Sequence, residues 1–184
     1  MPRTFIAVDI QPTRALLDLI GQLQQLGNRF RTVAVDQLHV TLKFLGETSD
    51  SQIAPIEAIV KRIVESRLAF HATLSGLGAF PYARRPAVVW VGLDPAEPLR
   101  QIAAELDREL SGLGFQPEER PLSPHLTLLR VKVRPPESLL SLLAEESHTD
   151  FGAVEISRVN FYQSELSRTG SRYTRLATAV MRKG

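Results

Sequence analysis

The sequence contains no cysteine in its 184 residues. Disulfide bonds, thiolate nucleophiles, Cys-ligated zinc and iron–sulfur clusters are therefore excluded. Long hydrophobic runs are missing as well, because the longest one, residues 87–93, is far shorter than the roughly 20 residues of a membrane-spanning helix. No segment has the composition of a secretory signal peptide, since Asp9 interrupts the first apolar stretch. We expect a cytoplasmic protein with no membrane partner.

A large charge of one sign is also lacking. Lysine and arginine number 22, aspartate and glutamate 20, and the net charge with neutral histidines is +2. Any attraction to nucleic acid must therefore come from a local patch of basic side chains. Hydrophobic residues make up 43% of the chain and charged residues 23%, which is typical of a globular protein with a sizeable core.

Apolar periodicity alternates between strand and helix patterns along the whole chain. The Gly- and Pro-containing stretch 76–86 is expected to form turns. No low-complexity linker separates the two halves, so the pattern favours two closely packed lobes. The periodicity predicts strands over 4–10, 32–35, 38–45, 70–74, 87–93, 122–133, 154–162 and 173–180, and helices over 12–26, 51–67, 99–113 and 136–143.

One short motif occurs twice. Residues 39–42 read His-Val-Thr-Leu and residues 125–128 read His-Leu-Thr-Leu, and the copies lie about half a chain length apart. Comparable helix and strand patterns surround each copy. The repeat therefore indicates a duplicated unit that mixes helices and strands.

Alternation along a strand gives each copy two chemically different faces. Side chains at positions i and i+2 point to the same side, so His39 shares a face with Thr41, and His125 shares one with Thr127. The opposite face of each strand is apolar. If a pseudo-two-fold axis relates the lobes, two imidazoles and two hydroxyls meet across a groove.

Such a groove suits cleavage of a phosphate ester. One histidine acts as a neutral base while the other acts as a protonated acid, and the threonines hydrogen-bond the phosphate oxygens. A single histidine on a strand is more often structural, and it is the second copy that favours catalysis. A zinc site is the weaker interpretation, because the sequence has no His-Glu-x-x-His motif and no obvious third ligand. His71 and His148 lie outside the motifs and are interpreted as structural or surface residues.

These motifs and their flanks resemble the 2H phosphoesterases, and most of all their bacterial and archaeal RNA 2′,3′-cyclic phosphodiesterase branch, also called 2′-5′ RNA ligases. The resemblance extends over essentially the whole chain. Beyond the two motifs it is carried by residues 5–9 (Phe-Ile-Ala-Val-Asp), the Thr-Leu-Lys-Phe-Leu-Gly run ending at Gly46, residues 86–92 with Trp90, the run from Ser123 to Arg130, residues 163–166 and residues 170–173.

The resemblance implies an α+β, LigT-like fold: one domain over residues 1–184 with two pseudo-symmetric lobes, whose antiparallel sheets face each other across a central cleft with helices outside. It also implies hydrolysis of RNA 2′,3′-cyclic phosphate ends to 2′-phosphate ends, with no cofactor and no metal. By this analogy His125 is the general base, His39 is the general acid, and Thr41 and Thr127 position the phosphate. The near symmetry of the site leaves the choice between acid and base open from the sequence alone. In reverse, the same site would form a 2′-5′ linkage, although hydrolysis should dominate in water.

Candidate substrate-binding residues follow each motif. Strict alternation places Lys43 on the face of His39, where it would add positive charge, and a solvated lysine is the equal alternative. Alternation puts Arg130 opposite His125, so Arg130 reaches the cleft only if the strand bulges or ends first. The same rule puts Phe44 on the apolar face, which favours core packing over base stacking.

Basic and aromatic residues in expected loops or strand starts are further candidates to guide single-stranded RNA, with solvated surface as the alternative. They are Arg84, Arg85, Arg120, Arg172 and Tyr173.

Other functions remain open beside the leading one. A non-catalytic RNA-binding module would use the same cleft, and a phosphodiesterase of this family would act on 2′-5′-linked oligonucleotides or small cyclic nucleotides. The paired titratable groups favour an enzyme, whose partners would be RNA ends or small cyclic nucleotides. A monomer is expected, because each half already has a partner face.

Overall fold

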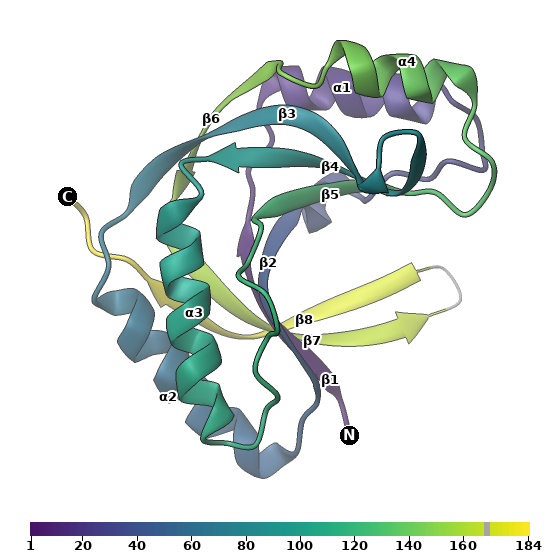
Figure 1. Ribbon diagram of the computed structural model, residues 1–184. Helices are drawn as coiled ribbons and strands as arrows, with labels where there is room; N and C mark the ends of the chain where they lie inside the picture. Colours follow the sequence, from purple (N-terminus) through teal and green to yellow (C-terminus); the bar gives the residue numbers. More distant parts are fainter. Residues whose placement is uncertain (168–169) are drawn as a thin grey trace.

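A computed structural model describes residues 1–167 and 170–184 of the chain (Figure 1). It contains two four-stranded antiparallel sheets, ordered β2-β1-β7-β8 and β5-β4-β3-β6. The predicted α+β fold with two antiparallel sheets is thereby confirmed. The strands are β1 (Arg3–Asp9), β2 (His39–Glu47), β3 (Phe70–Tyr82), β4 (Arg85–Asp94), β5 (His125–Arg130), β6 (Asp150–Ile156), β7 (Arg158–Ser167) and β8 (Gly170–Val180). The helices are α1 (Arg14–Gln24), α2 (Asp50–Glu65), α3 (Glu97–Ser111) and α4 (Glu137–Glu145).

The two motif strands are the edge strands that lie next to each other where the sheets meet. Helices α1 and α4 pack on β6 and β3 of the second sheet, α2 packs on β7 and β8, and α3 packs on β2 (Figure 1). The helices therefore cover the sheets from outside, as expected. Within the described part of the chain, no helix is both long and apolar enough to cross a membrane.

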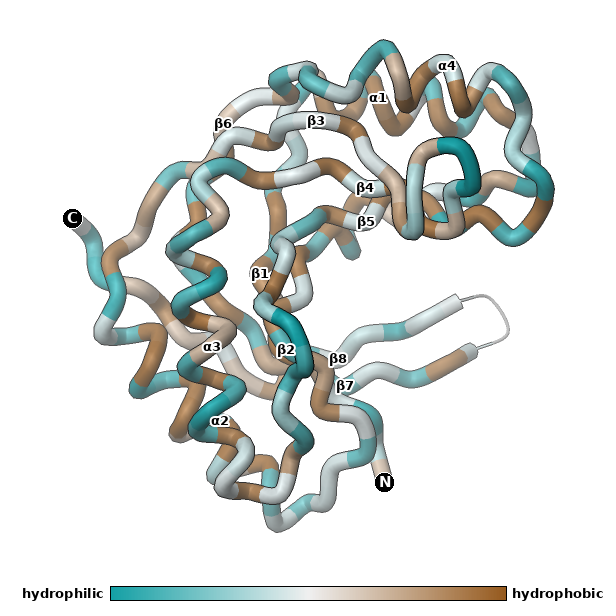
Figure 2. The backbone as a smooth tube through the Cα atoms, viewed as in Figure 1, coloured by the Kyte–Doolittle hydropathy of each residue, from teal (hydrophilic) through white to brown (hydrophobic). Residues whose placement is uncertain are grey.

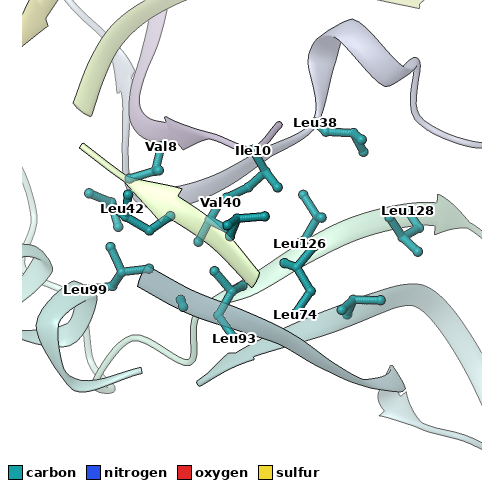
Figure 3. Packing of buried hydrophobic residues seen from close by; sticks show 14 of the residues in the cluster. Val8, Ile10, Leu38, Val40, Leu42, Leu74, Leu93, Leu99, Leu126 and Leu128 are labelled. Carbon is teal, nitrogen blue, oxygen red and sulfur yellow. The ribbon is translucent and has the colours of Figure 1, made fainter. Parts of the chain in front are cut away.

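A continuous apolar core joins the two sheets. Figure 3 shows Val40 of β2 and Leu126 of β5 pointing into one cluster with Leu74 and Leu93 of the second sheet. Val40, Leu126 and Leu74 are fully buried, and burying a side chain of this size contributes about 1.5–3 kcal/mol. The apolar faces of β2 and β5 thus fix the two motif strands against each other.

The segment before β2 differs from its prediction. Residues 32–35 do not form a strand; Thr32 makes one isolated bridge to Leu129, and the Val33 N–H donates to the Leu128 carbonyl at 2.8 Å. A short apolar run does not distinguish a strand from an extended loop. The segment from the first half therefore borders β5 of the second half.

The predicted turn region 76–86 is mostly strand. Gly76 has a φ of 76° at a register shift of β3, and Gly78 lies beneath the ring of Trp90. Gly76 therefore permits a bulge, and Gly78 allows two strands to approach closely.

Two other strand predictions were wrong in their bounds. Ser157 divides the strand predicted over 154–162 between β6 and β7, and of the range 122–133 only β5 forms a strand. The internal pseudo-symmetry of a single domain stays a prediction.

Candidate active site

A bulge at the same place in each motif strand decides which side chains reach the cleft. The partners of Thr41 and Lys43 on β1 are consecutive residues, so Leu42 is an extra residue in β2. Leu128 is the corresponding extra residue in β5. Because a bulge interrupts the two-residue alternation, the positions beyond it change faces.

All four motif residues line one cavity. His39 and Thr41 line it from β2, and His125 and Thr127 line it from β5. The cavity has a volume of about 930 Å³. The structure therefore brings together the histidines and threonines that the sequence predicts.

The two imidazoles are held in the same way. His39 Nδ1 lies 2.7 Å from the Gln37 carbonyl oxygen, and His125 Nδ1 lies 2.8 Å from the Ser123 carbonyl oxygen. A carbonyl oxygen only accepts, so each Nδ1 carries a proton and donates it. Each Nε2 is then left to accept a proton when the ring is neutral or to donate one when it is charged.

The surroundings of His39 act on its charge in opposite directions. Burial lowers the pKa of His39, whereas the hydrogen bond to Gln37 and the carboxylate of Asp9 raise it, and the positive charge of Arg130 lowers it. Asp9 lies directly opposite His39 in the β1–β2 pairing. The influence of Arg130 on His39 shows that a residue of β5 acts on the histidine of β2.

Asp9 is itself held by polar groups of the neighbouring strands. Its carboxylate accepts hydrogen bonds from Tyr162 Oη at 2.7 Å, Asn160 Nδ2 at 2.9 Å and Arg175 at 3.2 Å. Burial and the Asp9 carboxylate raise the pKa of Tyr162, which keeps the phenol in its donating form. Hydrogen bonds from β7 and β8 therefore hold the carboxylate that lies next to His39 on β1.

Each histidine also contacts aromatic rings. Tyr173 packs edge-on against His39 with ring centroids 5.4 Å apart, and Phe80 packs edge-on against His125 at 5.0 Å. The ring centroid of Phe5 lies 5.3 Å from that of His39, with the two planes tilted by 37°. Such contacts restrict rotation of the imidazoles and position Nε2. Tyr173 is thus at the site as predicted, whereas Phe5 and Phe80 were not singled out from the sequence.

Lys43 borders the cavity, but its ammonium group is neither free nor solvated. Its side chain is 1% exposed, and Nζ lies 2.6 Å from Asp107 Oδ1, 3.0 Å from the Gln116 carbonyl oxygen and 3.6 Å from Glu118 Oε1. The bulge at Leu42 turns this side chain away from the face of His39. The expected positive charge at the cleft is therefore neutralised by an ion pair.

Because of the two bulges, the side chains of Arg130 and Phe44 both line the cavity. Arg130 is exposed and lines the cavity, which satisfies the condition that the strand must bulge. The prediction of core packing for Phe44 is wrong, because this ring is 66% exposed and also lines the cavity. The sequence does carry a sign that alternation breaks in β5, because Leu128 and Leu129 are consecutive leucines, and both are buried in the structure.

The remaining basic candidates divide into two groups. Arg120 lines the cavity, whereas Arg172 is exposed on β8 and does not line it, and Arg84 and Arg85 lie at the β3–β4 turn. Arg3 and Arg100, which were not predicted, line the cavity as well. Among the described residues no group of three or more His, Asp or Glu side chains is arranged to hold a metal ion.

Two antiparallel sheets thus place a His-x-Thr strand on either side of one cavity. The model of the 2′-5′ RNA ligase superfamily matches residues 10–168, and the chain belongs to this family. An RNA 2′,3′-cyclic phosphodiesterase of Aeropyrum pernix is 39% identical over 86% of this chain and 94% of its own. Its counterpart in Methanothermobacter thermautotrophicus is 33% identical over 94% of this chain and 95% of its own.

Solved structures agree with this assignment. TT0787 of Thermus thermophilus has a TM-score of 0.82 and 26% identity, with 98% of each chain covered. LigT of E. coli complexed with 3′-AMP has a TM-score of 0.71 and 28% identity, again with 98% of each chain covered. The predicted LigT-like fold is therefore confirmed.

Proposed function

We propose that the protein hydrolyses RNA 2′,3′-cyclic phosphate ends to 2′-phosphate ends by acid–base catalysis with His39 and His125. The observation that carries the proposal is that two imidazoles with the same Nδ1–H tautomer line one cavity together with Arg130. The printed names of the relatives, RNA 2′,3′-cyclic phosphodiesterases, support the substrate class. RNA ends are then the partner, and small cyclic nucleotides are minimal substrates.

The reaction balances with these two groups alone. His125 Nε2 takes a proton from water, the water oxygen attacks phosphorus, and the P–O3′ bond breaks. His39 Nε2 gives its proton to the departing O3′, so the products are a 2′-phosphomonoester and a 3′-hydroxyl. Arg130 and the hydroxyls of Thr41 and Thr127 bind the phosphate oxygens, on which negative charge builds up in the transition state.

The low pKa that burial gives His39 favours the neutral ring in the free protein, which opposes an acid role. The opposing effect of the Asp9 carboxylate is already part of this balance. The anionic phosphate of a bound substrate adds to it, because negative charge favours the protonated ring. We therefore assign the acid role to His39 in the substrate complex and the base role to His125 on the opposite strand.

A substrate with sulfur in place of the bridging O3′ tests this division of roles, because a thiolate leaves without protonation. His39→Ala should lose turnover of the oxygen substrate, by 10²-fold or more on the order expected for a lost general acid, and regain most of it with the sulfur substrate. His125→Ala should be inactive with both. Equal rescue of the two variants would contradict the assignment of acid and base.

The reaction itself is tested with a short RNA that ends in a 2′,3′-cyclic phosphate, incubated in EDTA and followed by phosphorus NMR. We expect a 2′-phosphate from the parent protein and none from either histidine variant. A second RNA with a 5′-hydroxyl, added in excess, tests the reverse reaction to a 2′-5′ linkage. An unchanged cyclic end with RNA still bound would instead support a non-catalytic binding module. Turnover of 2′-5′-linked oligonucleotides alone would assign the protein to another phosphodiesterase activity of the same family.

A further inference from the structure

Three segments of the chain without a single carboxylate meet at one end of the second sheet. Residues 19–35, 77–93 and 120–136 contain no aspartate or glutamate. They contain the exposed cations Arg29 and Arg31 before β2, Arg84 and Arg85 at the β3–β4 turn, and Lys132 and Arg134 after β5. We call these six residues the basic end.

Backbone pairing brings the three segments of the basic end together. Thr32, which follows Arg31, forms a bridge to Leu129, the neighbour of Arg130. The Val131 N–H, next to Lys132, donates to the Ala87 carbonyl at 2.8 Å, close to the start of β4 at Arg85. The β3–β4 turn is one of the strongly hydrophilic segments in Figure 2.

No cation of the basic end is neutralised within the described structure. The ion pairs of residues 1–167 and 170–184 involve other lysines and arginines, and none of these six side chains takes part in a hydrogen bond there. A chain of net charge +2 thus concentrates unpaired positive charge at one place. Repulsion among these groups is tolerated on a surface that binds an anion.

The basic end is continuous with the catalytic cavity. β5 runs from His125 through Arg130, which lines the cavity, and the chain then continues outside to Lys132 and Arg134. The cavity wall near the start of β5 carries charges of both signs, because Glu118 and Glu119 line it there together with Arg100 and Arg120. The carboxylate-free side of the cavity therefore lies toward the end of β5, and an RNA strand with its negative phosphates is favoured there.

We propose that the basic end binds the phosphates upstream of the reacting 3′ end, so that the preferred substrate is a single-stranded RNA of several nucleotides and not a small cyclic nucleotide. This inference rests on the proposed function. Exposed Tyr82 and Val133, which are 54% and 38% exposed, lie among the cations. An aromatic ring among basic side chains is typical of surfaces that bind single strands.

Two double variants of the basic end, Arg84→Gln/Arg85→Gln and Lys132→Gln/Arg134→Gln, test the proposal against a matched control. The control is Arg158→Gln/Lys183→Gln, which removes two exposed cations that make no ion pair in the described structure and lie away from the basic end. Each double variant lowers the net charge equally, so only the position of the lost charge differs. The substrates are cytidine 2′,3′-cyclic phosphate and an eight-nucleotide RNA with the same cyclic end.

For the parent protein we expect kcat/KM to be about tenfold or more higher for the octamer, with a strong salt dependence. The basic-end variants should lose about 5- to 10-fold on the octamer, with a salt slope shallower by about 1.4, and change less than about twofold on the mononucleotide. The control variant should behave as the parent. A parent without length preference, or equal losses in control and basic-end variants, would overturn the proposal.

Two further measurements separate the possible failures. Binding of a labelled octamer that ends in a 2′-phosphate, followed by fluorescence anisotropy, requires no turnover. If the octamer binds and the basic-end variants weaken this binding, but no cyclic end is hydrolysed, the proposed function is refuted and RNA binding by the basic end is supported. If polyglutamate displaces the octamer as effectively as unlabelled RNA of equal charge, the basic end binds an acidic protein instead, and the proposal of RNA binding is refuted.

Discussion

Arg130 and Phe44 occupy equivalent positions on the two motif strands, each five residues after its histidine and just beyond a bulge. Both are exposed and line the same cavity. The site therefore repeats its histidines and threonines but not this position, where one strand offers a guanidinium and the other an aromatic ring. A nucleotide has the same two parts, a charged phosphate and a flat base.

Arg130→Gln removes the cation that we assign to the phosphate. We expect kcat to fall by about 10²–10³-fold, as for the loss of one donor to a developing oxyanion. The pKa of His39 should rise, because the positive charge that disfavours its protonated form is gone. An NMR titration of the His39 ring measures this shift without substrate, and an unchanged or lower pKa would contradict the electrostatic effect of Arg130 on His39 across the cleft.

Phe44→Ala removes the ring that we assign to the base. Stacking of a base on an aromatic side chain is worth about 1–3 kcal/mol, so KM for a nucleoside 2′,3′-cyclic phosphate should rise about tenfold. Methyl riboside 2′,3′-cyclic phosphate has no base, and its KM should not change. Tyr82→Ala is the matched control, because Tyr82 is exposed but does not line the cavity. A similar loss with both substrates would place Phe44 in the framework of the site instead.

The sequence predicted the motif pairs correctly because His39 and Thr41, like His125 and Thr127, precede the bulges. Beyond the bulges the same rule of alternation was wrong for Lys43 and Phe44. A bulge depends on how the strand pairs with β1 or β4, which is a tertiary property. The hydropathy pattern of one strand therefore gives only indirect evidence of a bulge. The mixed fold was predictable from periodicity, whereas the glycines of β3 were not, because Gly78 is required by the ring on the neighbouring strand.

The ion pair of Lys43 and Asp107 should respond unequally to loss of either partner. Asp107→Ala leaves an ammonium group that is 1% exposed in the native fold, whereas Lys43→Met leaves carboxylates of Asp107 and Glu118 that are 22% and 56% exposed. Water solvates those carboxylates, so we expect a loss of about 1 kcal/mol in the free energy of unfolding for Lys43→Met and about 3 kcal/mol for Asp107→Ala. Urea unfolding at neutral pH measures both, and the reverse order would show that the ammonium is solvated.

Gly78 is required where β3 passes under Trp90, next to the proposed catalytic site. A Cβ atom at this glycine would lie 2.4 Å from Cη2 of the indole ring, so the ring must move in Gly78→Ala. In the described structure the indole N–H has no hydrogen-bond partner, and the ring is held by packing alone. Its centroid lies 6.3 Å from that of His125 and 5.1 Å from that of Phe80.

We therefore expect Gly78→Ala to lose about 1–3 kcal/mol of stability, as overpacked sites do, to change the emission of the single tryptophan, and to lower kcat through a displaced His125. Gly21→Ala is a control of opposite sign. Its added methyl group meets nothing within 4 Å on helix α1, so the variant should gain about 0.5–1 kcal/mol from helix propensity, with unchanged emission and kcat. Equal stability and emission in the parent and Gly78→Ala would show that the Trp90 ring moves without an energetic cost, and that its packing does not position the imidazole of His125.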